Sequence, residues 1–224
     1  MALINDVYNY IENKYKPNEP IFLAELDIPG MKAVSIRQQM KKLTEDGRLK
    51  RFDVGIYYIP KKSMFRSGST LSVDEVIRKK YLQDGASCCG YVGGILFANQ
   101  LGLTTQVPAL YEVYTNKATT EYRETRLANL RVILRKPYCE VDEKNAETLQ
   151  FLDLIKEVVD ISEVDGEELT KRLLSYMKKK NIGFESMRPF LPYYPDRIYK
   201  NMYEVGLLNG VSENEYTDIW YKKV

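Results

Sequence analysis

The chain has 224 residues, which allows one large domain or two of ordinary size. Hydrophobic residues make up 44% and charged residues 29%, the balance of a globular protein with a buried core. No apolar run approaches the roughly 18 residues that cross a bilayer. Asp6 falls where a signal peptide needs a basic and then apolar stretch. We therefore expect a cytoplasmic protein with no membrane partner.

The chain has no histidine and only three cysteines. The lack of histidine excludes histidine-based nucleophilic triads and removes the commonest metal ligand. Cys88 and Cys89 are adjacent and cannot bridge each other in ordinary geometry. Three sulfurs are too few for a four-cysteine zinc site. We expect small, buried, reduced thiols, no metal and no other cofactor.

The first thirty residues predict one helix and an apolar turn. Apolar side chains at helical spacing predict a helix over 2–15, which Pro17 and Pro20 end. A short apolar segment over 21–26 follows, and we expect it to form a short helical turn. It stops at the Pro29-Gly30 breaker.

The next thirty residues predict a second helix and a hairpin. The helix covers 32–45, and Gly47 is suited to the left-handed position after a helix end. The β-prone runs 49–52 and 56–59 flank a short turn that contains glycine, which predicts a hairpin. Helix, short helix, turn, helix and hairpin form the order of a winged helix-turn-helix, which we assign to residues 1–66.

Positive charge is concentrated in this segment. Residues 32–66 carry ten basic and three acidic residues, a net charge of +7. The other 189 residues carry 23 basic and 28 acidic residues, a net charge of −5. A basic block confined to one short segment indicates phosphate binding if it folds onto one face.

The 32–45 helix has the pattern of a DNA recognition helix. On a helical wheel Ile36, Met40 and Leu43 cluster in a narrow arc that faces the core, and polar side chains cover the rest. Arg37 suits guanine and Gln38 adenine, whereas the other polar and basic residues suit phosphates. The predicted DNA-binding residues are Lys32, Ser35, Arg37, Gln38, Lys41, Lys42, Lys50 and Arg51, with Lys61 and Lys62 at the end of the hairpin. A solvated helix face used for protein contacts remains the alternative.

Residues 67–224 predict a larger, mixed α+β domain with a helical C-terminal part. Residues 63–72 are polar enough for a linker, and Ser72 with Glu75 forms a capping-box pattern before a helix over 73–82. A further apolar helix follows Gly94 and reaches about Leu101. Two strands and three later helices are expected, at 110–115 and 131–135, and at 144–159, 166–180 and 195–207.

The glycine-rich stretch Gly90–Gly94 could in principle hold a phosphate at a helix N-terminus. It lacks the Gly-Lys-Ser/Thr ending of a P-loop and the spacing of a dinucleotide fingerprint. We therefore expect a tight turn where a helix packs closely on a sheet. Tyr193 and Tyr194 are expected to serve helix packing.

Several motifs follow one another in a recognisable order. Gly90 to Pro108 reads Gly-Tyr-Val-Gly-Gly-Ile-Leu-Phe-Ala-Asn-Gln-Leu-Gly-Leu-Thr-Thr-Gln-Val-Pro. Before it come Ser-Ile-Arg-Gln, then Gly-Arg-Leu-Lys-Arg leading into Gly-Ile-Tyr-Tyr-Ile-Pro, and after it comes Tyr-Glu-Val-Tyr-Thr-Asn. Over residues 1 to about 160 this order resembles the AbiEi-type antitoxins of type IV toxin–antitoxin systems. The Tyr-rich C-terminal segment departs from that pattern.

The resemblance implies a repressor that binds inverted repeats upstream of its own toxin–antitoxin operon. It also implies that the second domain opposes a nucleotidyltransferase-like toxin without an obligatory complex. Only recognition-helix and wing positions carry over from the family, namely Ser35, Arg37, Gln38, Lys41, Lys50 and Arg51.

The main enzyme hypothesis would make this chain a nucleotidyltransferase. That chemistry needs carboxylates that hold two metals, commonly Asp-x-Asp after Gly-Ser. Gly68-Ser69 is present, but Asp74-Glu75-Val76 supplies no such pair, and Asp153 and Asp160 lie seven residues apart on a predicted helix. We predict a protein that is not an enzyme. A winged-helix transcription factor that senses a metabolite through its second domain, with no toxin, remains the alternative function.

Overall fold

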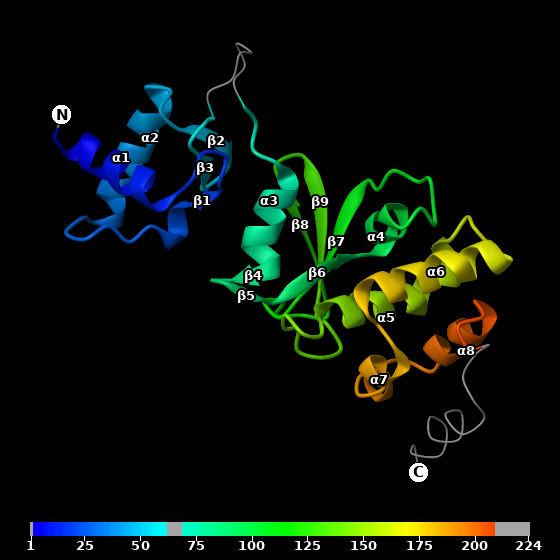
Figure 1. The fold of residues 1–224 in the computed structure, drawn as a ribbon. Helices are drawn as coiled ribbons and strands as arrows, with labels where there is room; N and C mark the ends of the chain where they lie inside the picture. Colours follow the sequence, from blue (N-terminus) through cyan, green and yellow to red (C-terminus); the bar gives the residue numbers. More distant parts are fainter. Residues whose placement is uncertain (1, 62–68, 209–224) are drawn as a thin grey trace. The chain divides into compact units, whose positions relative to one another are not determined.

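The computed structural model describes residues 2–61 and 69–208, and the chain divides into two compact units, Met1–Lys80 and Tyr81–Val224 (Figure 1). Lys62 and Arg66 of the basic segment, and residues 63–68 of the predicted linker, lie outside the described residues. The sequence-based boundary falls after residue 66, whereas the first compact unit continues to Lys80. The whole is a mixed α+β protein, as the sequence predicts.

The first unit follows the predicted element order closely. It contains α1 (Ala2–Lys14), β1 (Ile21–Phe22), η1 (Leu23–Glu25), α2 (Ala33–Glu45), β2 (Lys50–Asp53) and β3 (Ile56–Tyr58). The three strands form an antiparallel sheet in the order β1-β3-β2. The short helix expected over 21–26 is wrong in its first half, because Ile21 and Phe22 pair with β3 and only the next three residues form a 3-10 turn.

The core of this unit is the apolar seam that the sequence predicts. Ile36 is 4% exposed, and Met40 and Leu43 are fully buried, in one cluster with Val7 and Ile11 of α1. Helix α2 ends where expected, and Gly47 follows in the left-handed region with φ 71°. A residue with a side chain is strained in that conformation, which explains the glycine.

A second helical segment closes the first unit. The Ser72 Oγ accepts a hydrogen bond from the Asp74 amide at 3.2 Å and caps α3 (Val73–Ile77). The helix continues as a π-helical turn, η2 (Arg78–Leu82), so the predicted span of 73–82 is confirmed. Within the unit, Lys79 Nζ lies 2.8 Å from Glu19 Oε1 and holds this segment to the loop before β1.

The second unit is built on a four-stranded sheet of order β6-β7-β9-β8. Its strands are β6 (Gly90–Gly93), β7 (Leu110–Thr115), β8 (Tyr122–Leu127) and β9 (Leu130–Arg135); β7 and β9 are parallel and the other pairs antiparallel. A small hairpin, β4 (Gln83–Asp84) with β5 (Ser87–Cys88), precedes it. The strands predicted at 110–115 and 131–135 are confirmed, whereas β6 and β8 were not predicted.

The tight turn expected over Gly90–Gly94 is wrong for most of its length, because residues 90–93 form β6. The glycines are needed there for close strand approach: a Cβ at Gly90 would lie 2.4 Å from the Tyr114 carbonyl oxygen, and one at Gly93 2.7 Å from the Tyr114 ring. The turn is confined to Gly94, with φ 60°, where α4 (Gly94–Gln100) begins.

Helices pack on the sheet around one buried helix, α5 (Ala146–Ile161). Helices α4 and α5 contact β6, and α7 (Phe184–Met187) and α8 (Arg197–Glu204) contact α5, as Figure 1 shows. Helix α6 (Gly166–Lys180) and the turn η3 (Leu191–Tyr193) complete this layer. The helices predicted at 144–159, 166–180 and 195–207 are confirmed within a few residues. Among the described residues, no helix is both long and apolar enough to span a bilayer.

Candidate nucleic-acid interface

The predicted DNA-binding residues of α2 are all solvent-exposed. Lys32 is the N-cap residue, and its carbonyl accepts a hydrogen bond from the Ile36 amide at 3.1 Å. The exposed set comprises Lys32, Ser35, Arg37, Gln38, Lys41 and Lys42. On the hairpin, Arg51 is exposed and Lys50 is half-buried. Because the apolar seam of α2 faces inward, these polar side chains can reach a ligand without disturbing the core.

The turn before α2 sets where the helix begins. Gly30 has φ 78°, and the Met31 amide donates to the Ile28 carbonyl at 3.0 Å. Pro29 precedes the glycine, and the two residues form a turn of fixed geometry. Helix α2 begins shortly after this turn, and Ser35 and Arg37 in its first turns are exposed to solvent.

Internal contacts engage some of the basic groups on this surface and leave others without a partner among the described residues. Lys41 pairs with Glu45 at 3.8 Å, but both side chains are more than half exposed, so the pair is weak. The Arg51 Nε donates to the Asp53 carbonyl at 3.2 Å, and the Arg48 guanidinium lies 5.2 Å from the centre of the Tyr8 ring. Within residues 2–61 and 69–208, no ion pair or hydrogen bond engages the side chains of Arg37, Gln38 or Lys42.

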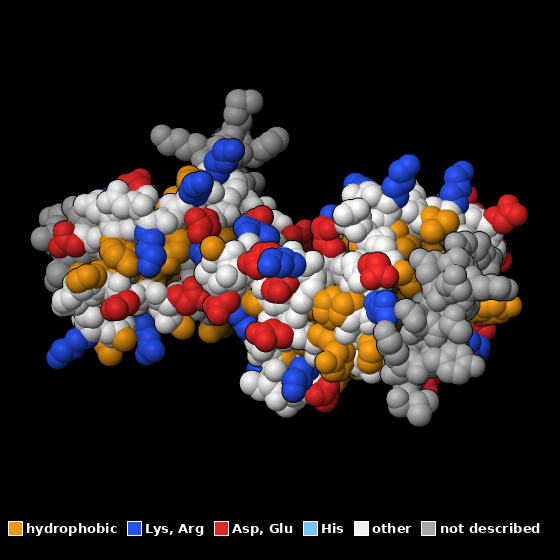
Figure 2. All heavy atoms as spheres, turned by 60° about the horizontal axis from the view of Figure 1, so that its bottom comes forward, with side chains coloured by type: hydrophobic (Ala, Val, Ile, Leu, Met, Phe, Trp, Pro, Cys, Tyr) orange, Lys and Arg blue, Asp and Glu red, His pale blue; other side chains and the backbone are white. Residues whose placement is uncertain are grey.

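The structure also brings Arg37 of α2 together with the hairpin. Arg37 and the hairpin-turn residues Val54 and Gly55 line one pocket, so the helix and the hairpin turn lie next to each other. The face drawn in Figure 2 carries acidic and basic side chains interspersed, with exposed hydrophobic side chains between them.

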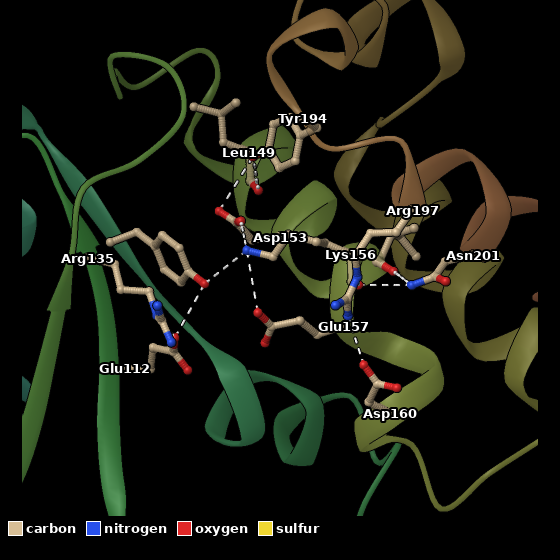
Figure 3. Close-up of polar contacts among 12 residues, drawn as sticks. Glu112, Arg135, Leu149, Asp153, Lys156, Glu157, Asp160, Tyr194, Arg197 and Asn201 are labelled. Carbon is tan, nitrogen blue, oxygen red and sulfur yellow. Dashed lines mark hydrogen bonds and ion pairs between the residues drawn. The ribbon is translucent and has the colours of Figure 1, made fainter. Parts of the chain in front are cut away.

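A buried ion pair in the second unit was missed in the sequence. Asp153 and Lys156 lie one turn apart on α5, and Lys156 Nζ is 2.9 Å from Asp153 Oδ1 (Figure 3). The side chains are 1% and 9% exposed. The Tyr91 hydroxyl donates to Asp153 Oδ2 at 2.5 Å, and the Tyr194 hydroxyl donates to the Leu149 carbonyl at 3.2 Å and lies 3.5 Å from the same Asp153 oxygen.

Aromatic rings and further polar groups surround the Lys156 ammonium. It lies 5.4 Å from the centre of the Tyr114 ring and 5.1 Å from that of Tyr138, with Glu157 Oε1 at 3.4 Å. Arg135 pairs with Glu112, whose Oε1 accepts from the Tyr114 hydroxyl at 3.4 Å. The network thus joins the sheet to α5.

Helix α8 is attached to the same part of α5. The Arg197 guanidinium donates to the Lys156 carbonyl at 2.6 Å and to Asp160 at 2.8 Å, and the Asn201 amide donates to the Lys156 carbonyl at 2.9 Å (Figure 3). Asp160 is exposed, whereas Asp153 is buried, so the two carboxylates serve different partners.

Burial sets the protonation of this cluster. Burial raises the pKa of Asp153, and the Lys156 ammonium and the Tyr91 hydroxyl counteract that effect. Burial lowers the pKa of Lys156, but the Asp153 carboxylate raises it to above its ordinary value. Burial, reinforced by the Asp153 carboxylate, raises the pKa of Tyr91, Tyr114 and Tyr194.

These tyrosines make stability depend on pH in the alkaline range. The folded protein retains their protons where the unfolded chain, with a tyrosine pKa of 10.0, releases them. Their contribution is therefore complete below about pH 10 and lost as the pH rises above it. We expect the free energy of unfolding, measured in urea, to fall steeply there, and less steeply in Tyr194→Phe. Tyr203→Phe, at a position 67% exposed, is the control. A flat profile would contradict the prediction.

The cysteines and the late tyrosine pair match their expectations in part. Cys89 is buried as expected, whereas Cys88 and Cys139 are partly exposed, so the expected burial is wrong for these two. All three are free thiols. Tyr194 packs in the core as expected. Tyr193 is 63% exposed, so the predicted packing role of Tyr193 is wrong. Among the described residues, no three Cys, Asp or Glu side chains gather in a group that could hold a metal.

Comparison with known proteins finds no family model that matches the chain and no curated protein that matches it.

Proposed function

We propose that the first unit is a winged helix-turn-helix that binds double-stranded DNA. In this proposal α2 is the recognition helix and the β2–β3 hairpin is the wing. The observation that carries the proposal is the set of exposed polar and basic residues on α2, opposite the buried seam of Ile36, Met40 and Leu43. A recognition helix needs such a division between a face that docks and a face that reads.

Within the whole chain, we propose an autorepressor that also acts as a type IV antitoxin. The support is the motif order that resembles the AbiEi-type antitoxins. The protein would bind inverted repeats upstream of its own operon in the cytoplasm. The second unit would oppose a nucleotidyltransferase-like toxin without a stable complex. No catalytic role is assigned to any residue of this chain in the proposal.

Salt dependence of DNA binding tests the first part. If about five phosphates are neutralised, log K should fall against log salt concentration with a slope near −4.5 for duplex DNA. Titrating a fluorescent fragment of the upstream region with the full chain, by anisotropy at several salt concentrations, measures that slope. A scrambled duplex of equal length separates specific from non-specific binding. Absence of binding at low salt, or binding that salt leaves unchanged, would refute the DNA-binding role.

A further inference from the structure

An apolar pocket opens in the first unit between α2, η1 and the hairpin turn. Its volume is about 550 Å³, within the range of small-molecule sites. The walls include Phe22, Leu26, Ile36 and Ile56, each less than 9% exposed, and Val54, 79% exposed, lies in the turn that borders it. Removing apolar surface of this kind from water is favourable, so its burial by a ligand contributes to the binding free energy.

The lining also carries positive charge. Arg37 of α2 lines the pocket and forms no ion pair with the described residues, and Lys80, the last residue of the unit, is a second basic residue of the lining. No acidic side chain of the described residues lines it. A guanidinium beside an apolar cavity complements a ligand with a carboxylate head and a hydrocarbon chain, because the guanidinium fork matches both carboxylate oxygens.

We propose that this pocket binds a small amphipathic carboxylate and that its occupancy weakens DNA binding. The regulatory half rests on the proposed DNA-binding function. Arg37 would serve both ligands, and its guanidinium cannot hold a carboxylate in the pocket and a base edge in the major groove at once. The two ligands therefore compete, and each lowers the affinity for the other by the same factor.

Chain-length dependence tests the pocket without DNA. We would titrate the full chain with hexanoate, octanoate and decanoate by calorimetry, below the concentrations at which they form micelles. Each added methylene should lower Kd by about fourfold while the chain enters the apolar pocket. Equal affinities for the three acids would show a superficial ionic contact and overturn the proposal.

Charge variants identify the site. Arg37→Gln should raise the Kd for decanoate by about threefold but leave the Kd for decanol unchanged. Val54→Glu and Val54→Lys alter a side chain that is 79% exposed, so folding should be retained, as circular dichroism would check. The glutamate should weaken decanoate binding and the lysine strengthen it. Equal affinities in both Val54 variants would place the ligand elsewhere and overturn the assignment.

The DNA arm separates failure of the pocket from failure of the proposed function. Decanoate should raise the Kd for upstream DNA in the wild type, and decanol should raise it less. Decanoate that binds as predicted but leaves DNA affinity unchanged would overturn the competition. A chain that binds decanoate but no DNA would overturn the proposed function and the regulation, but it would support the assignment of the pocket as a carboxylate site. A chain that binds DNA but no decanoate would overturn the pocket alone.

Discussion

Lys156→Met is expected to destabilise the second unit by about 3–5 kcal/mol, because it leaves the Asp153 carboxylate buried without its cation. The hydroxyls of Tyr91 and Tyr194 near that carboxylate offset only part of the loss. Urea unfolding of the full chain, followed by circular dichroism, measures the change in the free energy of unfolding. The effect is large because a buried charge without a partner cannot be solvated by the protein interior.

Two further variants test whether the unpaired charge of Asp153 causes that loss of stability. Asp153→Asn with Lys156→Met removes both charges and keeps an oxygen that accepts from Tyr91, so it should recover much of the lost stability. Lys200→Met breaks the exposed pair with Glu204 and should change stability by less than about 1 kcal/mol. If Lys156→Met is as mild as Lys200→Met, water reaches the pair and the cluster does not hold the unit together.

If the chain has the function proposed above, Arg37→Ala with Lys41→Ala is expected to remove repression while leaving protection against the toxin intact. The variant removes a proposed base contact and a phosphate contact, and loss of one good base contact costs roughly 1–3 kcal/mol in discrimination. Both side chains are exposed and the seam of Ile36, Met40 and Leu43 is untouched, so folding should change little. Expression from a foreign promoter beside the toxin, with growth and reporter repression measured in the same cells, checks both readouts.

Lys171→Ala with Lys179→Ala is the matched control, because it removes two exposed positive charges from α6 instead. Repression and protection should both persist in it. Loss of protection by a folded Arg37→Ala, Lys41→Ala protein would mean that the DNA-reading surface itself opposes the toxin. Equal loss of repression in the two double variants would mean that overall charge, and not the α2 surface, governs binding.

The local sequence pattern was sufficient to predict most helices and most elements of the first unit, with β1 as the exception. The spacing of Ile36, Met40 and Leu43 predicted both the helix and its buried face, and those residues are buried. Pro29-Gly30 and Gly47 marked the ends of α2 because their backbone preferences act within one turn. The exposed residues of α2 could likewise be predicted, since a side chain opposite a narrow apolar seam has only solvent to face.

Strand pairing depended on contacts distant in sequence. Strand β8 is a polar edge strand in which only Leu127 is fully buried, so it has no period-two apolar signal and was missed. The glycines of β6 gave the signal of a turn, but their small size serves close approach to Tyr114, which lies more than twenty residues away along the chain. A turn and a tightly paired strand have the same local composition, and only the partner distinguishes them.

What the sequence by itself determined was therefore the set of locally encoded features: most of the helices, the hairpin, the core seam of α2 and the concentration of positive charge. What only the tertiary structure decided was which distant side chains meet. Asp153 and Lys156 look like solvated helix charges until Tyr91, Tyr114 and Tyr194 enclose them. Arg37 adjoins an apolar pocket only because the hairpin turn folds back beside α2. Periodicity reports the surroundings of one element, whereas burial of a charge or the shape of a pocket depends on every element that packs around it.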